Sequence, residues 1–481
     1  MDAPRPRCPS THSVYSESEI EPPVRGFTAP IPFKPTVTSI SEEHLSSDDE
    51  SPSFKPPSKI SLLKQFLLHQ SKAGFHEHDT VEQYNERKRK LKSFTHIPFH
   101  LERFILFGLL ICLDVFLYMF TILPLRIFTW CFSFLPFKVP FVRSSESYSH
   151  DITAGLLFLV GSLTALSWDI SSVYHAVRGQ NLLKLYSIYQ LIEIVDKLLG
   201  ALGQDAVDNV LFSQKVFQKG LFNLIYKKAA DLLFSLVYIV LHVTCLLFQL
   251  ITFNVAINSK SYSIVALLIS NNFTELKGAV FKKYTKIPLF QIAFTDITER
   301  FHLLTLTILT GIQSFIDMKG STSGNFDVDL FRQLLSTISV LLGSELIVDW
   351  AKHSFICYFN NHSSKLYPKY LKILLSDIFY SFNGFNSNPN NPKKRPSVAR
   401  RIGFVPLPLA CVTVRVLIDA FTGEVVKFKA FYLVMAFALA FAVKFVISAL
   451  LIFISCKSSG ARLDLDLHKV ERYLLLEKRV P

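Results

Sequence analysis

Residues 104–123, FILFGLLICLDVFLYMFTIL, restrict the possible folds of this chain most strongly, because they carry a single charge, Asp114. A helix of about 20 apolar residues crosses the roughly 30 Å hydrocarbon core of a bilayer. Just upstream, five of the six residues at 87–92 (RKRKLK) are basic, and the basic flanks of membrane helices tend to stay in the cytosol. We therefore predict a membrane helix that enters from the cytosol, with the N-terminus of the chain on the cytosolic side.

The composition indicates several membrane helices. Half of the 481 residues are hydrophobic and 44 are Phe, which is typical of a polytopic membrane protein. A net charge of +13 would suit a nucleic-acid-binding protein, but the basic residues lie beside apolar stretches, where they meet anionic lipid headgroups. We therefore expect the lipid bilayer as a partner and no nucleic acid. The seven cysteines show no CxxC spacing, so no disulfide framework or zinc site is expected.

The remaining apolar stretches predict an all-α, polytopic transmembrane helical bundle with six to eight spans. They are residues 152–168, 232–253, 303–316, about 330–350, about 404–422 and 430–455. Residues 123–142 contain three prolines, which remove helical hydrogen bonds and favour a broken, partly interfacial segment. Gly155 and Gly161 lie within residues 152–168 and would permit a close approach between helices.

The ends of the chain are polar. Residues 1–58 are rich in Pro, Ser and Glu and predict a disordered cytosolic tail. Ser46, Ser47 and Ser51 adjoin acidic residues, which fits either phosphorylation or a merely solvated tail. Residues 59–98 predict a basic juxtamembrane segment with an amphipathic helix that lies on the membrane or packs against the protein's own cytosolic face. Residues 457–481 predict a charged C-terminal helix.

Three segments inside residues 99–456, the predicted multi-pass membrane domain, are not simple spans. Residues 169–228 and 254–301 carry apolar residues every three or four positions, which predicts half-buried or interfacial helices. Residues 360–401 are rich in Asn, Pro and basic residues. This last segment predicts a polar loop.

Several charged residues fall inside the apolar stretches, where charges are costly and often functional. They are Asp114, Glu345, Asp349, Arg415, Asp419 and Lys444. One hypothesis is a polar route, as in a transporter or a lipid-handling protein. The other is a set of internal ion pairs between helices, with snorkelling of charges at helix ends. Arg415 and Asp419 are four residues apart, on one face of a single helix, and could pair along it. The spans show no internal repeat of the kind found in many transporters.

No catalytic or cofactor motif is present. The chain lacks HExxH, GxSxG, a Walker loop and a GxGxxG that opens a βαβ unit. The run HEHD at 76–79 offers metal-ligand side chains, but it is a polar run without a further partner, and a solvated segment is the simpler interpretation. We therefore expect no enzyme activity, no metal and no cofactor.

A series of short sequences resembles the Tapt family (transmembrane anterior posterior transformation), a group of eukaryotic multi-pass membrane proteins. The matching pieces follow one another from about residue 94 to 455. They are FHLERF at 99–104, YHAVRGQ at 174–180, EIVDK at 193–197, NNFTELKG at 271–278, VFKK at 280–283, DITERF at 296–301 and ELIVDWAKH at 345–353. Together these pieces resemble a fungal-type member.

The resemblance implies a protein of the endoplasmic reticulum membrane. Fungal members are linked to a SUN-like-domain glycoprotein and to protection of newly made proteins during folding, and no catalytic residues are assigned to the family. Its polar motif residues are expected to be structural or assembly contacts. Arg178 and Gln180 would bond carbonyls at a helix end, and Asn271 and Asn272 would cap the helix that contains 275–283. The basic residues Lys277, Lys282 and Lys283 would meet phosphates or lipid headgroups.

Three functional hypotheses remain. The first is a non-enzymatic scaffold in protein folding and quality control with a SUN-like-domain partner. The second is a transporter or lipid-handling protein that uses the intramembrane charges. The third is a membrane tether whose acidic tail recruits cytosolic proteins.

Overall fold

The computed structural model describes residues 63–68, 80–132, 145–216, 221–258, 262–321, 328–383, 398–422 and 429–458. The chain divides into two units, Met1–Glu77 and His78–Pro481. In the first unit, residues 63–68 are helical and exposed. The predictions for the tail at 1–58 with its serines, for the HEHD run and for residues 459–481 lie outside the described residues.

Every regular element among the described residues of the second unit is a helix, which confirms the predicted all-α class. The helices are α2 (Val81–Phe120), α3 (Ile122–Phe132), α4 (Ser145–Ser167), α5 (Ile170–Arg178), α6 (Leu182–Val216), α7 (Leu221–Ile257), α8 (Tyr262–Val280), α9 (Lys286–Ser321), α10 (Val328–Phe359), α11 (Leu366–Asn383), α12 (Val398–Ile402), α13 (Pro406–Thr422) and α14 (Lys429–Ser458).

Five helical stretches of the described part are long and apolar enough to cross a membrane. They are Val81–Trp130, His150–Ser167, Ala229–Ile257, Phe331–Phe359 and Leu433–Lys457. This confirms a polytopic bundle but is fewer than the six to eight spans predicted. The predicted stretch at 404–422 forms α13, whose 17 residues fall short of the roughly 20 that a span needs.

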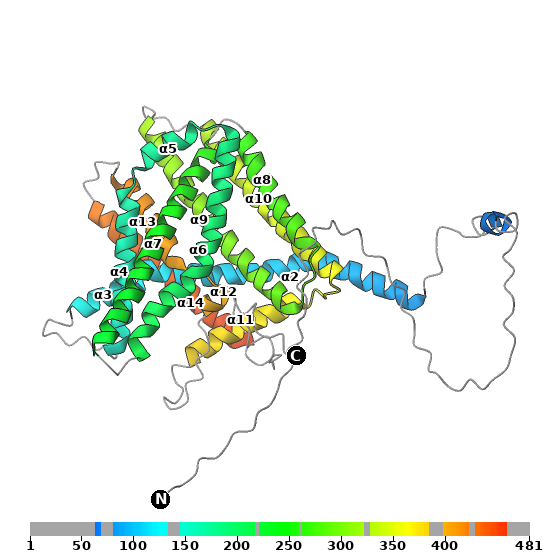
Figure 1. Ribbon diagram of the computed structural model, residues 1–481, viewed down its shortest axis with the longest axis horizontal. Helices are drawn as coiled ribbons and strands as arrows, with labels where there is room; N and C mark the ends of the chain where they lie inside the picture. Colours follow the sequence, from blue (N-terminus) through cyan, green and yellow to red (C-terminus); the bar gives the residue numbers. More distant parts are fainter. Residues whose placement is uncertain are drawn as a thin grey trace, which may run out of the picture. The chain divides into compact units, whose positions relative to one another are not determined.

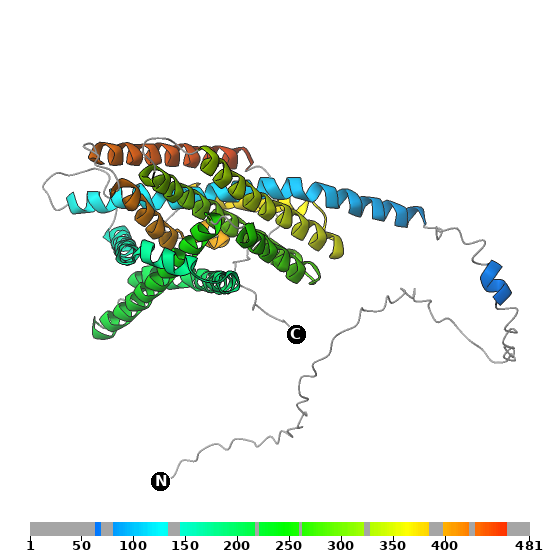
Figure 2. The ribbon, with the colours of Figure 1, turned by 90° about the horizontal axis from the view of Figure 1, so that it is seen from above.

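Helix α2 is the central element of the bundle. It begins with a capping box, in which the Thr80 hydroxyl accepts from the Gln83 N–H and the Gln83 side chain accepts from the Thr80 N–H. It then continues for 40 residues and contacts α3, α9, α10, α11, α12, α13 and α14 (Figure 1). Figure 2 shows α14 running beside it. Its buried Phe104 packs against the rings of Phe290 and Phe294 of α9.

Close contacts surround α4, as its glycines predict. A Cβ added at Gly161 would lie 2.7 Å from the Cys411 sulfur, and one at Gly155 would overlap Ile127. In addition, Arg126 of α3 forms a 2.9 Å ion pair with Asp151 of α4. The interrupted segment predicted at 123–142 is helical as far as Phe132, and its remainder lies outside the described residues.

The prediction of a polar loop at 360–401 is wrong for much of that segment. Residues Leu366–Asn383 form α11, which buries Tyr367, Tyr370 and Leu374 in the core. The loop was predicted from the average composition of residues 360–401, in which the Asn- and Pro-rich flanks outweigh the helix. Within LYPKYLKILLSDIFYSF, however, apolar residues recur at helical spacing and form the buried face of α11. Arg401 of α12 also forms an ion pair with Asp377 of α11 at 2.5 Å. Helix α11 is therefore held in the bundle both by its buried apolar residues and by this ion pair.

Candidate functional site

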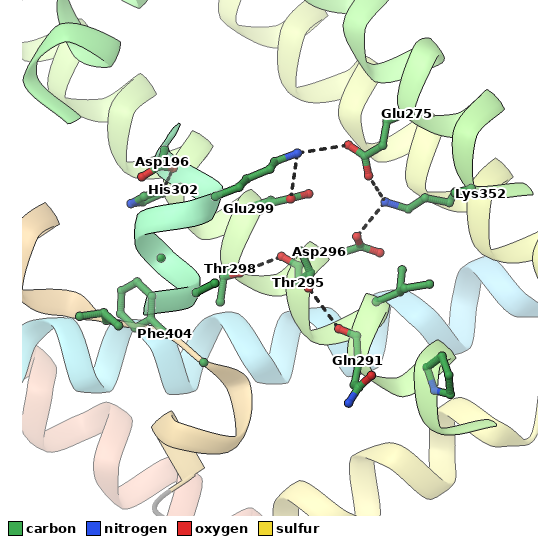
Figure 3. Close-up of a pocket in the computed structure, with 18 of the residues that line it drawn as sticks. Asp196, Glu275, Gln291, Thr295, Asp296, Thr298, Glu299, His302, Lys352 and Phe404 are labelled. Atoms are coloured by element: carbon green, nitrogen blue, oxygen red, sulfur yellow. Dashed lines mark hydrogen bonds and ion pairs between the residues drawn. The ribbon is translucent and has the colours of Figure 1, made fainter. Parts of the chain in front are cut away.

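A cavity of about 520 Å³ lies among α6, α7, α8, α9, α10 and the link between α12 and α13. Its lining includes side chains from four of the sequence motifs described above, EIVDK, NNFTELKG, DITERF and ELIVDWAKH. Figure 3 shows Glu275, Asp296, Glu299 and Lys352 converging on one wall of it. We call the ion pairs and hydrogen bonds around this cavity the charge network.

Lys352 of α10 lies at the centre of the charge network, with its side chain only 3% exposed. Its Nζ is 2.7 Å from Asp296 of α9, 3.0 Å from Asp349 of α10 and 3.1 Å from Glu275 of α8. A buried ammonium group is tolerated only when carboxylates and hydrogen bonds surround it. One lysine therefore connects three helices.

Lys197 of α6 is a second bridging cation. Its Nζ is 3.2 Å from both Glu193 and Glu299 and 3.7 Å from Glu275, so Glu275 lies between the two lysines. Burial alone would lower the pKa of Lys197, but the carboxylates of Glu299, Glu275 and Glu193 outweigh burial and raise it. Burial raises the pKa of Glu299 to about 7, although Lys197 acts in the opposite direction. At neutral pH, Glu299 is therefore close to its midpoint of titration.

Arg300 of α9 joins the charge network to the central helix. Its Nε donates to Asp349 and its Nη1 donates to Glu102 of α2, each at 2.8 Å. The indole N–H of Trp350 donates to the same Glu102 oxygen at 2.7 Å. Two donors from different helices thus fix one carboxylate of the FHLERF motif.

Histidines complete the charge network at two places. His242 of α7 lies 2.9 Å from Asp196 and 2.7 Å from the Tyr238 hydroxyl. Burial would raise the pKa of Asp196, but His302 and His242 hold it well below its usual range. On the opposite side, His353 contacts Asp296 at 2.5 Å and the Tyr367 hydroxyl at 2.7 Å. Each of these two aspartates therefore accepts from a histidine.

The charge network is acidic overall. Eight carboxylates face three permanent cations, Lys197, Arg300 and Lys352. Ligand atoms of Glu275, Asp296 and Glu299 lie within 4.8 Å of one another, close enough to share a metal ion. The two lysine ammonium groups already supply positive charge there. Their positions favour mutual neutralisation by protein groups over a resident cation.

Glu345, Asp349, Asn271 and Asn272 from the sequence prediction all belong to the charge network. The prediction that the two asparagines cap a helix is wrong, because they lie in the middle of α8. Asn271 donates to Glu193 at 2.7 Å and Asn272 donates to Glu345 at 2.5 Å. The apolar residues before them extend the helix back to Tyr262 and so remove the need for a cap.

The other predicted residues are distributed around the bundle. Gln180 donates to the Ala176 carbonyl at 3.1 Å at the end of α5, as predicted, whereas Arg178 lies 6.0 Å from the Tyr174 ring centroid. Lys277 lies in the last turn of α8, and Lys282 and Lys283 lie just after this helix; all three are exposed. Their contact with phosphates or lipid headgroups stays a prediction.

The charges inside the apolar stretches are paired. Lys444 of α14 lies 2.5 Å from Asp114 of α2, and the Ser448 hydroxyl donates to the same carboxylate at 2.6 Å. On α13, Arg415 and Asp419 form an ion pair at 3.1 Å. This geometry satisfies the hypothesis of internal ion pairs.

The sequence prediction singled out too few members of the charge network. Those it missed are Glu102, Glu193, Asp196, Lys197, Glu275, Asp296, Glu299, Arg300, Lys352 and His353, together with His242 and His302. A signal was available for all of these except His242 and His302, because the others lie within motifs that carried the family resemblance.

These features define a multi-pass, α-helical membrane protein whose helices are joined by a buried charge network. Comparison with known proteins gives the family. The model of a eukaryotic membrane protein family matches residues 144–459, and the chain belongs to this family, which confirms the resemblance to the Tapt proteins. No solved structure matches the chain significantly.

Curated relatives come from distant eukaryotes. "Protein TAPT1 homolog" of Caenorhabditis elegans is 33% identical over 77% of this chain and 49% of its own length. "Transmembrane anterior posterior transformation protein 1 homolog" of Gallus gallus is 31% identical over 84% of this chain and 68% of its own length. "Endoplasmic reticulum membrane protein 65" of Schizosaccharomyces pombe is 33% identical over 70% of this chain and 54% of its own length. The chain thus spans about half the length of the nematode and fission yeast relatives.

Proposed function

We propose that this protein is a non-enzymatic scaffold of the endoplasmic reticulum membrane, with a cytosolic N-terminus. It would act in folding and quality control of newly made proteins together with a SUN-like-domain membrane glycoprotein. The name of the fission yeast relative supports the location. The partner and the folding role rest on the resemblance to fungal members of the family.

The observation that carries this proposal is the mutual pairing of the motif side chains. Each of the eight carboxylates in the charge network accepts from a cation, a histidine or an amide on another helix. A substrate site usually keeps some polar groups ready for its ligand, whereas a set of mutually paired groups fixes the arrangement of helices. Such an arrangement suits a protein whose main task is to hold a defined surface in the membrane.

Helix α14 supplies a candidate for that surface. Its membrane-crossing stretch is largely uncovered by the rest of the chain, and Leu439 and Phe453 are each 67% exposed. In a bilayer, either lipid or a transmembrane helix of a partner covers such a face. The two possibilities differ in their tolerance of bulk, because fluid lipid adapts to a larger side chain and a packed helix does not.

The proposal is tested by purifying the tagged protein in mild detergent and identifying its partners by mass spectrometry. We expect a SUN-like-domain glycoprotein at near-equal amount. Leu439→Trp should reduce that amount, while Leu159→Trp, a matched change at an exposed leucine of α4, should not. A homogeneous protein without such a glycoprotein would contradict the proposal.

The cavity of about 520 Å³ favours a second candidate function, a transporter or lipid-handling protein. In this case the ion pair between Lys197 and Glu299, and the other ion pairs that line the cavity, would break when a polar ligand enters. Proteoliposome assays of ion flux and lipid transfer test it directly, with Glu299→Gln and Asp114→Asn as variants. Activity that either variant abolishes, with the folded amount unchanged, would favour this function over the scaffold.

A further inference from the structure

A second cleft, of about 870 Å³, lies where the link between α8 and α9 meets the turn between α10 and α11. We call it the basic cleft. Its lining contains Lys282, Lys283, Lys286 and Lys369, as well as the imidazole of His362, and no Asp or Glu is among its described lining residues. The chemistry of the basic cleft is therefore opposite to that of the charge network.

All four lysines of the basic cleft are exposed, and three of them, Lys282, Lys283 and Lys286, are available to a ligand. Within the part of the chain that the structure describes, no carboxylate lies within ion-pair distance of Lys282, Lys283 or Lys286. Lys197 and Lys352, by contrast, are each surrounded by carboxylates. The positive charge of Lys282, Lys283 and Lys286 is thus left uncompensated by the described residues and favours an anion.

Two helices begin at the basic cleft. Lys286 is the first residue of α9, Leu366 is the first residue of α11, and both line the cleft. The N-terminal end of a helix carries a partial positive charge and backbone N–H groups that suit a phosphate or carboxylate. The start of α9 therefore adds to the attraction that the lysines provide, whereas at the start of α11 the Leu366 N–H already donates to the Ser363 carbonyl.

The floor of the basic cleft is held in place by hydrogen bonds to the α8–α9 link. Asn360 accepts from the Tyr284 N–H at 2.9 Å and donates to the Lys282 carbonyl at 3.3 Å. The Tyr370 hydroxyl donates to the Lys286 carbonyl at 2.7 Å. The turn on the other side is tight, since Asn361 has a positive φ of 54°. The backbone beneath the lysines is consequently fixed before any ligand binds.

An aromatic rim places the basic cleft at the edge of the bilayer. Phe359 is the last residue of the apolar stretch Phe331–Phe359, and its ring lies 5.8 Å from that of Phe281. Phe281 is 79% exposed and Phe359 is 53% exposed. Aromatic side chains are favoured at the level of lipid headgroups. A ligand in this position would have its phosphate among the lysines and its apolar part beside the two phenylalanines.

The same end of the bundle carries the basic segment of α2. Ser93, next to the RKRKLK run, accepts from the Ser364 N–H of the α10–α11 turn at 2.7 Å, and Phe94 packs on Phe355. Basic residues flanking spans mark the cytosolic side of a membrane. The basic cleft therefore faces the cytosolic leaflet, where anionic lipids gather near juxtamembrane lysines.

From the exposed lysines, the start of α9 and the aromatic rim, we infer that the basic cleft binds the phosphate-bearing headgroup of an anionic phospholipid of the cytosolic leaflet. The lysines and the α9 N-terminus hold the phosphate, and Phe281 and Phe359 lie along the acyl chains. This inference rests on the cytosolic orientation in the proposed function but not on the scaffold role, because it requires no protein partner.

Binding of dioctanoyl phosphatidic acid to the purified full-length protein in detergent tests the inference, measured by microscale thermophoresis. Lys282→Gln/Lys283→Gln removes two charges from the basic cleft. Lys277→Gln/Lys372→Gln removes two exposed lysines of α8 and α11 that do not line it. Since the first variant loses two cationic groups that hold the headgroup, we expect it to bind at least about tenfold more weakly, and we expect the second to bind nearly as tightly as the wild type.

Three results would overturn the inference. Equal losses in the two double variants would show general charge attraction rather than a site. Equal affinity for dioctanoyl phosphatidylcholine would remove the role of the anionic headgroup. Equal affinity for inorganic phosphate would identify a site for a soluble phosphate instead of a lipid. Gel filtration of each variant verifies that the protein is folded, and surface lysines are well suited to such a comparison because their loss seldom unfolds a protein.

Discussion

Two glycines of α6 offer a sharp test of how closely this bundle is packed. A Cβ at Gly203 would overlap the Tyr238 hydroxyl and lie 2.5 Å from its Cζ, whereas a Cβ at Gly200, almost one turn earlier, would have no neighbour within 4 Å. Tyr238 is not free to move aside, because it is buried and bonded to His242 at 2.7 Å. The same substitution on one helix should therefore have opposite effects at the two positions.

The magnitudes follow from these contacts. Overpacking costs about 1–3 kcal/mol, and loss of the buried bond between Tyr238 and His242 costs a further amount of about 1–3 kcal/mol. Replacing Gly by Ala in a helix contributes about 1 kcal/mol of stability. Gly203→Ala should therefore destabilise the protein by about 3 kcal/mol, and Gly200→Ala should stabilise it by about 1 kcal/mol.

Thermal unfolding in detergent, followed by fluorescence-detected gel filtration, is a suitable assay. We expect the melting temperature of Gly203→Ala to fall by several degrees and that of Gly200→Ala to stay level or rise. Tyr238→Phe removes the overlapping hydroxyl, so it should recover part of the loss when combined with Gly203→Ala. Equal melting temperatures for the two alanine variants would refute the described packing of α6 on α7.

Three further predictions concern the charged groups. Lys352→Met should destabilise the protein by about 3–5 kcal/mol because it leaves buried carboxylates uncompensated. The double variant Lys352→Met/Asp296→Asn should lose less stability than the sum of the losses in the two single variants, which a double-mutant cycle of melting temperatures measures. Burial raises the pKa of Glu299 from 4.5 to about 7, so between these values the folded state keeps a proton that the unfolded state releases. The melting temperature should therefore fall as the pH rises from about 5 to 8. If the Glu299→Gln variant showed the same dependence of melting temperature on pH as the wild type, Glu299 would not be its cause. Lys444→Met should lower the amount of folded protein recovered from membranes, because it leaves the Asp114 carboxylate without its cation. Adding Asp114→Asn should restore part of that amount. If the double variant gave no more folded protein than Lys444→Met alone, loss of the ion pair would not explain the effect of Lys444→Met.

The sequence predicted the helical stretches well where apolar residues are continuous. The stretches at 104–123, 152–168, 232–253, 330–350 and 430–455 each coincide with one of the five long apolar helices, and none extends more than three residues beyond its helix. Helix α11 was missed because its buried face is short and lies between Asn- and Pro-rich segments. Composition over a window of 40 residues conceals a helix of 18, while its spacing of apolar residues reveals it.

The charge network could not be predicted as a network. Lys352 and Asp296 are 56 residues apart in sequence, and Arg300 and Glu102 are 198 apart. A single sequence shows which helices are amphipathic, but it carries no information on which helix faces which. Pairs four residues apart on one helix, such as Arg415 and Asp419, were accessible because helix geometry alone brings them together.

The length of α2 has a mechanical consequence. Its 40 residues measure about 60 Å at 1.5 Å per residue, which is twice the roughly 30 Å thickness of a bilayer core. Along the chain, α2 first bonds and packs against the rest of the bundle at Ser93 and Phe94, so the 12 residues before them form a helical extension of about 18 Å. A force on Thr80 would therefore reach the bundle first at α10 and the α10–α11 turn, before it reaches the Glu102–Arg300 ion pair further along α2.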